Sequence, residues 1–131
     1  MSRSIVFALA FCVMTSLFSC STKAPETTWQ HLSTETGDLE PPNAGNQQTA
    51  SAIIDVDADG DQDFMITERT QTPAVVLYRY ADQAWQRYIV EDEPLRIEAG
   101  SAVHDIDGDG DLDVVFGGDG GSNQVWWWEN P

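Results

Sequence analysis

The sequence predicts an all-β chain built from two copies of one repeat. A nine-residue run, Asp55–Asp63, returns at Asp105–Asp113 with an Asp at every matching position. Short apolar runs separated by turn residues surround both copies at the same spacing, and no segment beyond the N-terminal run shows a helical period. Four strands in a repeat of about 50 residues are typical of one blade of a β-propeller. We therefore expect two four-stranded blades, the second of them truncated.

The N-terminal residues have the pattern of a secretion signal. Arg3 precedes a mostly apolar run, residues 5–18, which is short for a membrane span and has the length of a signal-peptide core. The run ends in Leu17-Phe18-Ser19-Cys20, which resembles the lipobox of bacterial lipoproteins. We expect a signal peptide over residues 1–19, a lipidated Cys20 and a polar tether over residues 20–27. An ordinary secretory signal and a retained anchor helix are the alternatives.

This signal implies an extracytoplasmic bacterial lipoprotein at the outer membrane or cell surface, which contacts the membrane only through the anchor at Cys20. The other cysteine of the chain, Cys12, would leave with the signal peptide. No cysteine then remains for a disulfide bond, so packing and bound metal must stabilise the folded chain.

Three segments follow the tether. Residues 28–49 read as an outer strand at Thr28–Leu32 and a loop rich in Gly, Pro and Asn. Residues 50–99 form the first repeat, with strands expected at Ala52–Ile54, Phe64–Thr67, Val75–Tyr78 and Trp85–Val90. Residues 100–131 form an incomplete second repeat, with strands expected at Ala102–His104, Val114–Phe116 and Val125–Trp128. His104 stands where the first repeat has Ile54, which favours a packing position over a catalytic base.

Both Asp runs have the composition of a calcium loop. Five carboxylates at alternate positions repel one another unless a cation lies among them, and hard oxygen ligands around a glycine-bearing turn suit Ca²⁺. The helix-loop-helix calcium hand is excluded because its twelfth position needs a Glu, and that position holds Ile66 or Phe116. The alternative is that both runs are solvated turns without a metal. Two copies in the same register argue against this alternative. We expect two structural Ca²⁺ sites.

The turn inside each loop needs glycine at one position. Gly60 and Gly110 lie where the loop must turn back, so we expect positive φ angles there. Ala58 replaces Gly108 in the first copy, which indicates that this other position is not sterically critical.

The doubled loop and the ending Trp126-Trp127-Trp128-Glu129-Asn130-Pro131 resemble the FG-GAP / VCBS repeat family over residues 28–131. That resemblance implies β-propellers similar to the head of integrin α subunits. It also implies that in each loop four side chains bind one Ca²⁺ and the seventh position contributes its backbone carbonyl. The side-chain ligands would be Asp55, Asp57, Asp59, Asp63 and, for the second ion, Asp105, Asp107, Asp109, Asp113. The backbone ligands would be Asp61 and Asp111. A closed propeller has more blades, so we expect a fragment of a larger ring or, alternatively, closure by oligomerisation.

Charge narrows the range of partners. The chain has 22 acidic and 6 basic residues and a net charge of −16, which argues against a nucleic-acid partner because phosphate binding needs Lys/Arg patches. Burial is the ordinary use of the tryptophans, but Trp127 points away from its two neighbours in a strand and is a candidate for stacking on a sugar ligand. No nucleophile, base and acid set is recognisable, so we expect no enzymatic activity.

Together these features predict a calcium-stabilised repeat protein of the bacterial cell envelope. It would act as a binding or adhesion module with a glycan or a surface protein as ligand. By resemblance, the alternatives are the N-terminal part of a propeller-type polysaccharide-degrading enzyme whose active site lies outside this chain, and a structural spacer.

Overall fold

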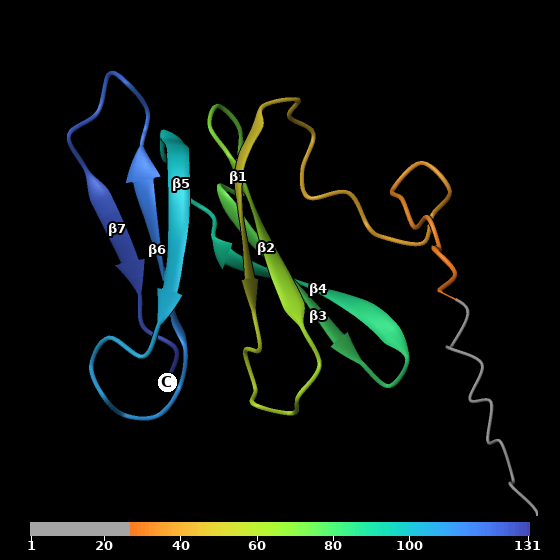
Figure 1. Cartoon of the computed structure of the whole chain (residues 1–131). Coiled ribbons are helices and arrows are strands. Elements are labelled where there is room, and N and C mark those ends of the chain that lie inside the picture. The colour runs from red at the N-terminus through yellow and green to blue at the C-terminus, as the bar shows by residue number, and fades with distance from the viewer. Residues whose placement is uncertain (1–26) are drawn as a thin grey trace, which may run out of the picture. The chain divides into compact units, whose positions relative to one another are not determined.

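The computed structural model describes residues 27–131, and in that part of the chain it contains strands but no helix (Figure 1). The predicted signal peptide, Cys20 and nearly all of the tether lie outside the described residues. All strands belong to one of two compact units, His31–Pro131. No helix within residues 27–131 is long and apolar enough to cross a membrane.

The strands form two open antiparallel sheets, each with its strands in sequence order. The first sheet contains β1 (Gln48–Ile54), β2 (Asp63–Glu68), β3 (Val75–Ala81) and β4 (Ala84–Glu91). The second sheet contains β5 (Ile97–His104), β6 (Asp113–Gly118) and β7 (Val125–Trp128). This confirms the all-β prediction and each strand expected within the two repeats.

The short connections explain why neighbouring strands pair. Asp82 and Gln83, between β3 and β4, have φ angles of 53° and 63°. Positive φ at both central residues is the geometry of the two-residue hairpin turns whose twist matches that of antiparallel strands. Ala81 and Ala84 pair directly on either side of this turn.

The prediction of an outer strand at Thr28–Leu32 is wrong. These residues have no strand structure, and Trp29 is 96% exposed. A strand requires a free edge with which its backbone can pair, and within the described residues no strand pairs with this segment. β1 also begins at Gln48, inside the stretch expected to be loop.

The core lies between one face of each sheet. Across the first sheet, Ala52 pairs with Met65 and Met65 with Leu77, and all three side chains are buried. Val114 and Phe116 of the second sheet pack against this face. Side chains alternate along a strand, so each sheet contributes a single face to this core.

The first strand of each sheet lies beside the other. The Ser101 hydroxyl on β5 donates a hydrogen bond of 2.7 Å to the carbonyl of Ser51 on β1. In Figure 1 the remaining strands of each sheet lead away from this pair. Ser51 and Ser101 occupy matching positions of the two repeats, so the repeats meet through equivalent strands.

A segment before β1 covers part of the other face of the first sheet. The Tyr78 hydroxyl donates a hydrogen bond of 2.6 Å to the carbonyl of Glu40, and the Asn43 side chain donates one of 2.9 Å to the carbonyl of Pro73. The buried Glu68 carboxylate accepts hydrogen bonds from the backbone N–H of Gln47 and of Thr70. These bonds fix residues 40–47 against the sheet.

Candidate metal centre

The two Asp loops occupy the same place in their sheets. Residues 55–62 connect β1 to β2, and residues 105–112 connect β5 to β6. Both loops lie at the same end of the two sheets in Figure 1. The sequence repeat is therefore also a structural repeat around the candidate ligands.

The last Asp of the first loop fastens the loop to the sheet. Asp63 is 2% exposed, and its carboxylate accepts hydrogen bonds from the backbone N–H of Val56 at 3.1 Å and of Tyr80 at 2.7 Å. The first contact closes the loop, and the second ties it to β3. A carboxylate that accepts two backbone N–H groups retains lone pairs for a cation.

Asp113 repeats this arrangement in the second loop. It is fully buried and accepts hydrogen bonds from the backbone N–H of Asn130 at 2.9 Å and of Ile106 at 3.0 Å. The bond from Asn130, together with that from Ile106, lowers the pKa of Asp113 although burial alone would raise it. The group is therefore anionic at neutral pH.

The first Asp of each loop organises the turn. The Asp55 carboxylate accepts hydrogen bonds of 3.1 Å from the backbone N–H of Asp59 and from that of Gly60. The Asp105 carboxylate accepts bonds of 2.7 Å from Gly108 and 3.2 Å from Gly110. Both loops therefore wrap around their first carboxylate.

Three carboxylates gather in each loop. Oxygen atoms of Asp55, Asp57 and Asp63 lie within 4.8 Å of one another, and the same holds for Asp105, Asp107 and Asp109. Each group contains three of the four side-chain ligands expected for its loop. The first group lacks Asp59 and the second lacks Asp113. The expected backbone ligands, Asp61 and Asp111, are also outside the groups of their loops. Such groups of oxygen ligands could hold a metal ion.

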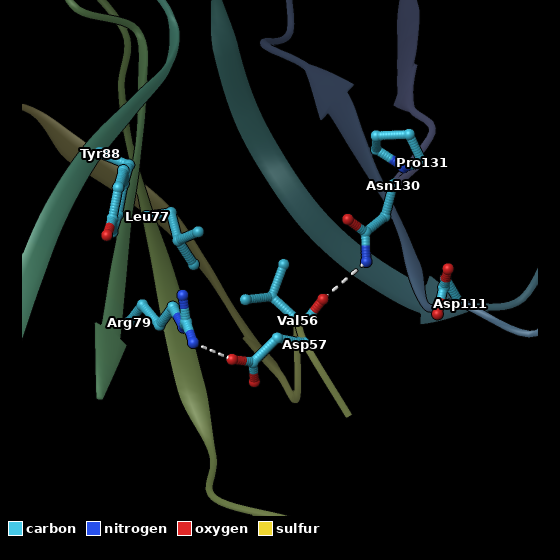
Figure 2. Close-up of a pocket in the computed structure, with 8 residues that line it drawn as sticks. All are labelled: Val56, Asp57, Leu77, Arg79, Tyr88, Asp111, Asn130 and Pro131. Carbon is cyan, nitrogen blue, oxygen red and sulfur yellow. Dashed lines mark hydrogen bonds and ion pairs between the residues drawn. The ribbon is translucent and has the colours of Figure 1, made fainter. Parts of the chain in front are cut away.

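A basic residue beside the first loop was missed by the sequence reasoning. The Arg79 guanidinium forms an ion pair with the Asp57 carboxylate, and Figure 2 shows the two side chains pointing toward each other. The second repeat has Glu129 at the position of Arg79. An alignment of the two repeats reveals this charge difference. It does not reveal that the Arg79 side chain reaches the Asp loop.

The second sheet also contacts the first loop directly. The Asn130 side chain donates a hydrogen bond of 2.8 Å to the carbonyl of Val56, as Figure 2 shows. These residues line a depression between the sheets. Its lining is Val56, Asp57, Leu77, Arg79, Tyr88, Asp111, Asn130 and Pro131.

The loop backbones confirm the expected glycine turns and add a conformational constraint at a second position. Gly60 and Gly110 have φ angles of 94° and 109°, as expected. Ala58 has a φ of 56°, and its counterpart Gly108 has a φ of 82°. That position therefore requires left-handed backbone in both loops, which disfavours a residue with a Cβ. As expected, the position is not crowded, since a side chain built at Gly108 would meet nothing within 4 Å, but Ala58 holds a left-handed backbone that a residue with a Cβ disfavours.

Two further candidates lie on the second sheet. Trp127 is 47% exposed on the face away from the core, so its role in stacking on a ligand stays a prediction. His104 is exposed, whereas its counterpart Ile54 is 2% exposed. The expectation of a packing position was therefore wrong for His104. The reason is that the second sheet covers the face of the first sheet on which Ile54 lies.

No protein-family model, no curated protein and no solved structure matches this chain. The resemblance to FG-GAP / VCBS repeats therefore rests on the residues quoted above.

Proposed function

We propose that this chain is a calcium-stabilised β-propeller repeat module that binds a glycan or protein ligand at the bacterial cell envelope. The observation that supports this proposal most strongly is the duplicated loop, in which a buried terminal Asp accepts two backbone N–H groups and three carboxylates gather. The three carboxylates differ between the loops, but two such loops at one end of two sheets favour a repeated binding site over two unrelated turns.

Electrostatics favours a bound cation. The loops gather carboxylates within 4.8 Å, where two like charges repel by about 1 kcal/mol even in water. Arg79 offsets one of these charges in the first loop, and the second loop has Glu129 at that position instead. Ca²⁺ accepts many oxygen ligands in irregular geometry, whereas Mg²⁺ demands an octahedron and keeps its waters. Calcium is therefore the ion that suits these loops.

The envelope location is supported by the lipobox-like residues Leu17–Cys20 and by the chemistry of calcium. Extracellular calcium sites have dissociation constants of about 0.1–1 mM and fill only where the ion is abundant. The proposed blade architecture is supported by the four-stranded first sheet and by the contact between β1 and β5.

The calcium sites are tested by melting the chain in calcium and in EDTA. Free Ca²⁺ at ten times the dissociation constant would stabilise the folded state by about 1.4 kcal/mol for each site. For a folded region of this size, two sites would raise Tm by about 10–20 °C. Metal analysis of the dialysed protein gives an independent readout.

Asp107→Asn is the decisive variant. In EDTA the loss of this charge relieves repulsion among the carboxylates, so the variant should melt at a higher temperature than the parent. In calcium the same change removes a metal ligand, so the variant should melt at a lower temperature than the parent. Asp92→Asn changes an exposed carboxylate outside the loops and should shift neither curve. An unchanged Tm in EDTA, with no metal found in the protein, refutes the calcium sites.

The binding role is tested separately on glycan and protein arrays. A ligand that the parent binds and a folded Trp127→Ala variant does not bind would support a stacking role for this ring. The absence of any ligand would instead indicate a structural spacer.

A further inference from the structure

The second sheet exposes an apolar face. Ala102 pairs with Val115 and Val115 with Trp127, so these side chains lie on one face, and Val125 lies on it beside Gly117. Val125 is 71% and Trp127 47% exposed. We call Ala102, Val115, Val125 and Trp127 the open face. All of β7 is apolar, and such continuous apolar strands are typical of sheets covered on both faces.

The matching residues of the first sheet are buried. They have the same pairing, Ala52 to Met65 to Leu77, and none of them is more than 8% exposed. Together with Val75 they form the face on which the second sheet packs. The open face therefore repeats, in residue type and in register, a face that is already covered inside this chain.

The side chains that cover this face come from the opposite side of the second sheet. They are Val103, Val114, Phe116, Trp126 and Trp128. The first sheet has an apolar residue at each matching position of its outer face. These residues are Ile53, Phe64, Ile66, Val76 and Tyr78. Val76 and Tyr78 are already buried inside the chain, so Ile53, Phe64 and Ile66 are the matching residues that remain accessible on this outer face.

A polar contact is duplicated as well. Inside the chain, the Ser101 hydroxyl donates a hydrogen bond to the carbonyl of Ser51 across the two sheets. Ser51 is exposed and has the same hydroxyl. In a repeated contact, Ser51 of another copy would donate to the carbonyl of Ser101.

The outer face of the first sheet is only partly covered by the segment before β1. Tyr78 and Arg87 donate hydrogen bonds to the carbonyls of Glu40 and Pro42. Ile53 and Ile89 remain 61% and 53% exposed on this face. A groove of about 410 Å³ remains between the segment and the sheet. A partner can therefore meet the β1 side of this face.

We propose that a second copy of this chain packs the outer face of its first sheet on the open face, head to tail. A second copy is the occupant because the accessible Ile53, Phe64 and Ile66 of its first sheet match Val103, Val114 and Phe116, which cover the equivalent face inside the chain. Such a contact is heterologous, since two different surfaces meet. The net charge of −16 opposes it, so association should strengthen as salt screens the repulsion.

Sedimentation of the whole chain over a range of concentrations and salt tests this proposal. The parent should self-associate, and more strongly at high salt. Val125→Lys, on the open face, and Ile53→Lys, on the outer face of the first sheet, should each weaken association at least about tenfold. Both residues are mostly exposed, so neither change should unfold the chain. Trp29→Lys makes the same kind of change at an exposed residue that belongs to neither sheet and should leave association intact.

Mixing the two variants gives the sharpest result. Val125→Lys retains an intact outer face and Ile53→Lys an intact open face, so an equal mixture should form a complex of two chains while each variant alone stays monomeric. A monomeric parent at every concentration and salt overturns the proposal, because another partner must then cover the open face. Association that survives both changes, that is lost in Trp29→Lys, or that the mixture fails to restore also overturns it.

Discussion

Replacing Ala58 by glycine should stabilise the first loop. Ala58 has a φ of 56°, in the left-handed region, whereas the second loop has Gly108 there with a φ of 82°. A side chain built at Gly108 would meet nothing within 4 Å, so this position is limited by backbone conformation and not by space. The exchange therefore isolates the conformational strain of one residue.

The magnitude is the difference between two opposing effects. Left-handed backbone costs a residue with a Cβ about 1–2 kcal/mol. Glycine removes this cost, but it also gives the unfolded chain more conformational freedom, which lowers the stability of the fold by about 0.4–1 kcal/mol. The difference spans about 0–1.6 kcal/mol, so Ala58→Gly should stabilise the fold by about 0.8 kcal/mol, or about 3–6 °C in Tm. Gly108→Ala should cost a similar amount.

Urea denaturation in EDTA measures this difference without a metal contribution. Ala44→Gly, at an exposed position without positive φ, is the matched control and should lose about 0.4–1 kcal/mol. If Ala58→Gly destabilises the chain as much as Ala44→Gly does, the left-handed strain at Ala58 does not exist in solution and the reasoning fails.

Three further outcomes concern groups outside the loops. Glu68→Ala should cost about 2–3 kcal/mol in urea denaturation, because it removes a buried acceptor from the N–H groups of Gln47 and Thr70; a loss below half of that would contradict the role assigned to Glu68. Although burial alone would raise them, hydrogen bonds from Thr70 hold the pKa of Glu68 below its usual range, and bonds from Gly121 and Arg96 do the same for the pKa of Asp119. Such groups stabilise the fold above their unfolded pKa values, so the Tm difference in EDTA between the parent and Glu68→Ala should be nearly constant down to about pH 5 and shrink as the pH drops below about 4; a difference that grows there contradicts this sign. Tyr78→Phe should cost about 1 kcal/mol and speed proteolytic cleavage within residues 31–45, whereas unchanged cleavage would show that the bond to Glu40 does not hold this segment.

The period of the sequence predicts the parts of this molecule that repeat. Two Asp runs at one spacing, each between apolar runs, place both loops between two strands, and the structure confirms this arrangement. Local pattern suffices there because alternation and turn residues act over a few positions. The buried positions of Asp63 and Asp113 could not be predicted in this way, since their partners lie far along the chain, Tyr80 in β3 and Asn130 after the end of β7.

Where the two repeats differ in environment, the sequence misleads. Ile54 and His104 match in position, but only the first lies on a face that another sheet covers. The expected strand at Thr28–Leu32 has strand-like residues, but no strand of the described chain pairs with it. The ion pair of Arg79 with Asp57 depends on the reach of a long side chain, which spacing alone does not determine.

The hydrogen bond between Ser51 and Ser101 locates the axis that relates the two repeats. A rotation moves each point in proportion to its distance from the axis, so equivalent residues that touch must lie close to it. The axis therefore passes near β1 and β5. If head-to-tail packing repeats the same rotation, each added copy turns about those strands. Assembly would then follow a curved path about this axis, closing into a ring where the rotation divides a full turn without a shift along the axis and winding into a helical filament otherwise.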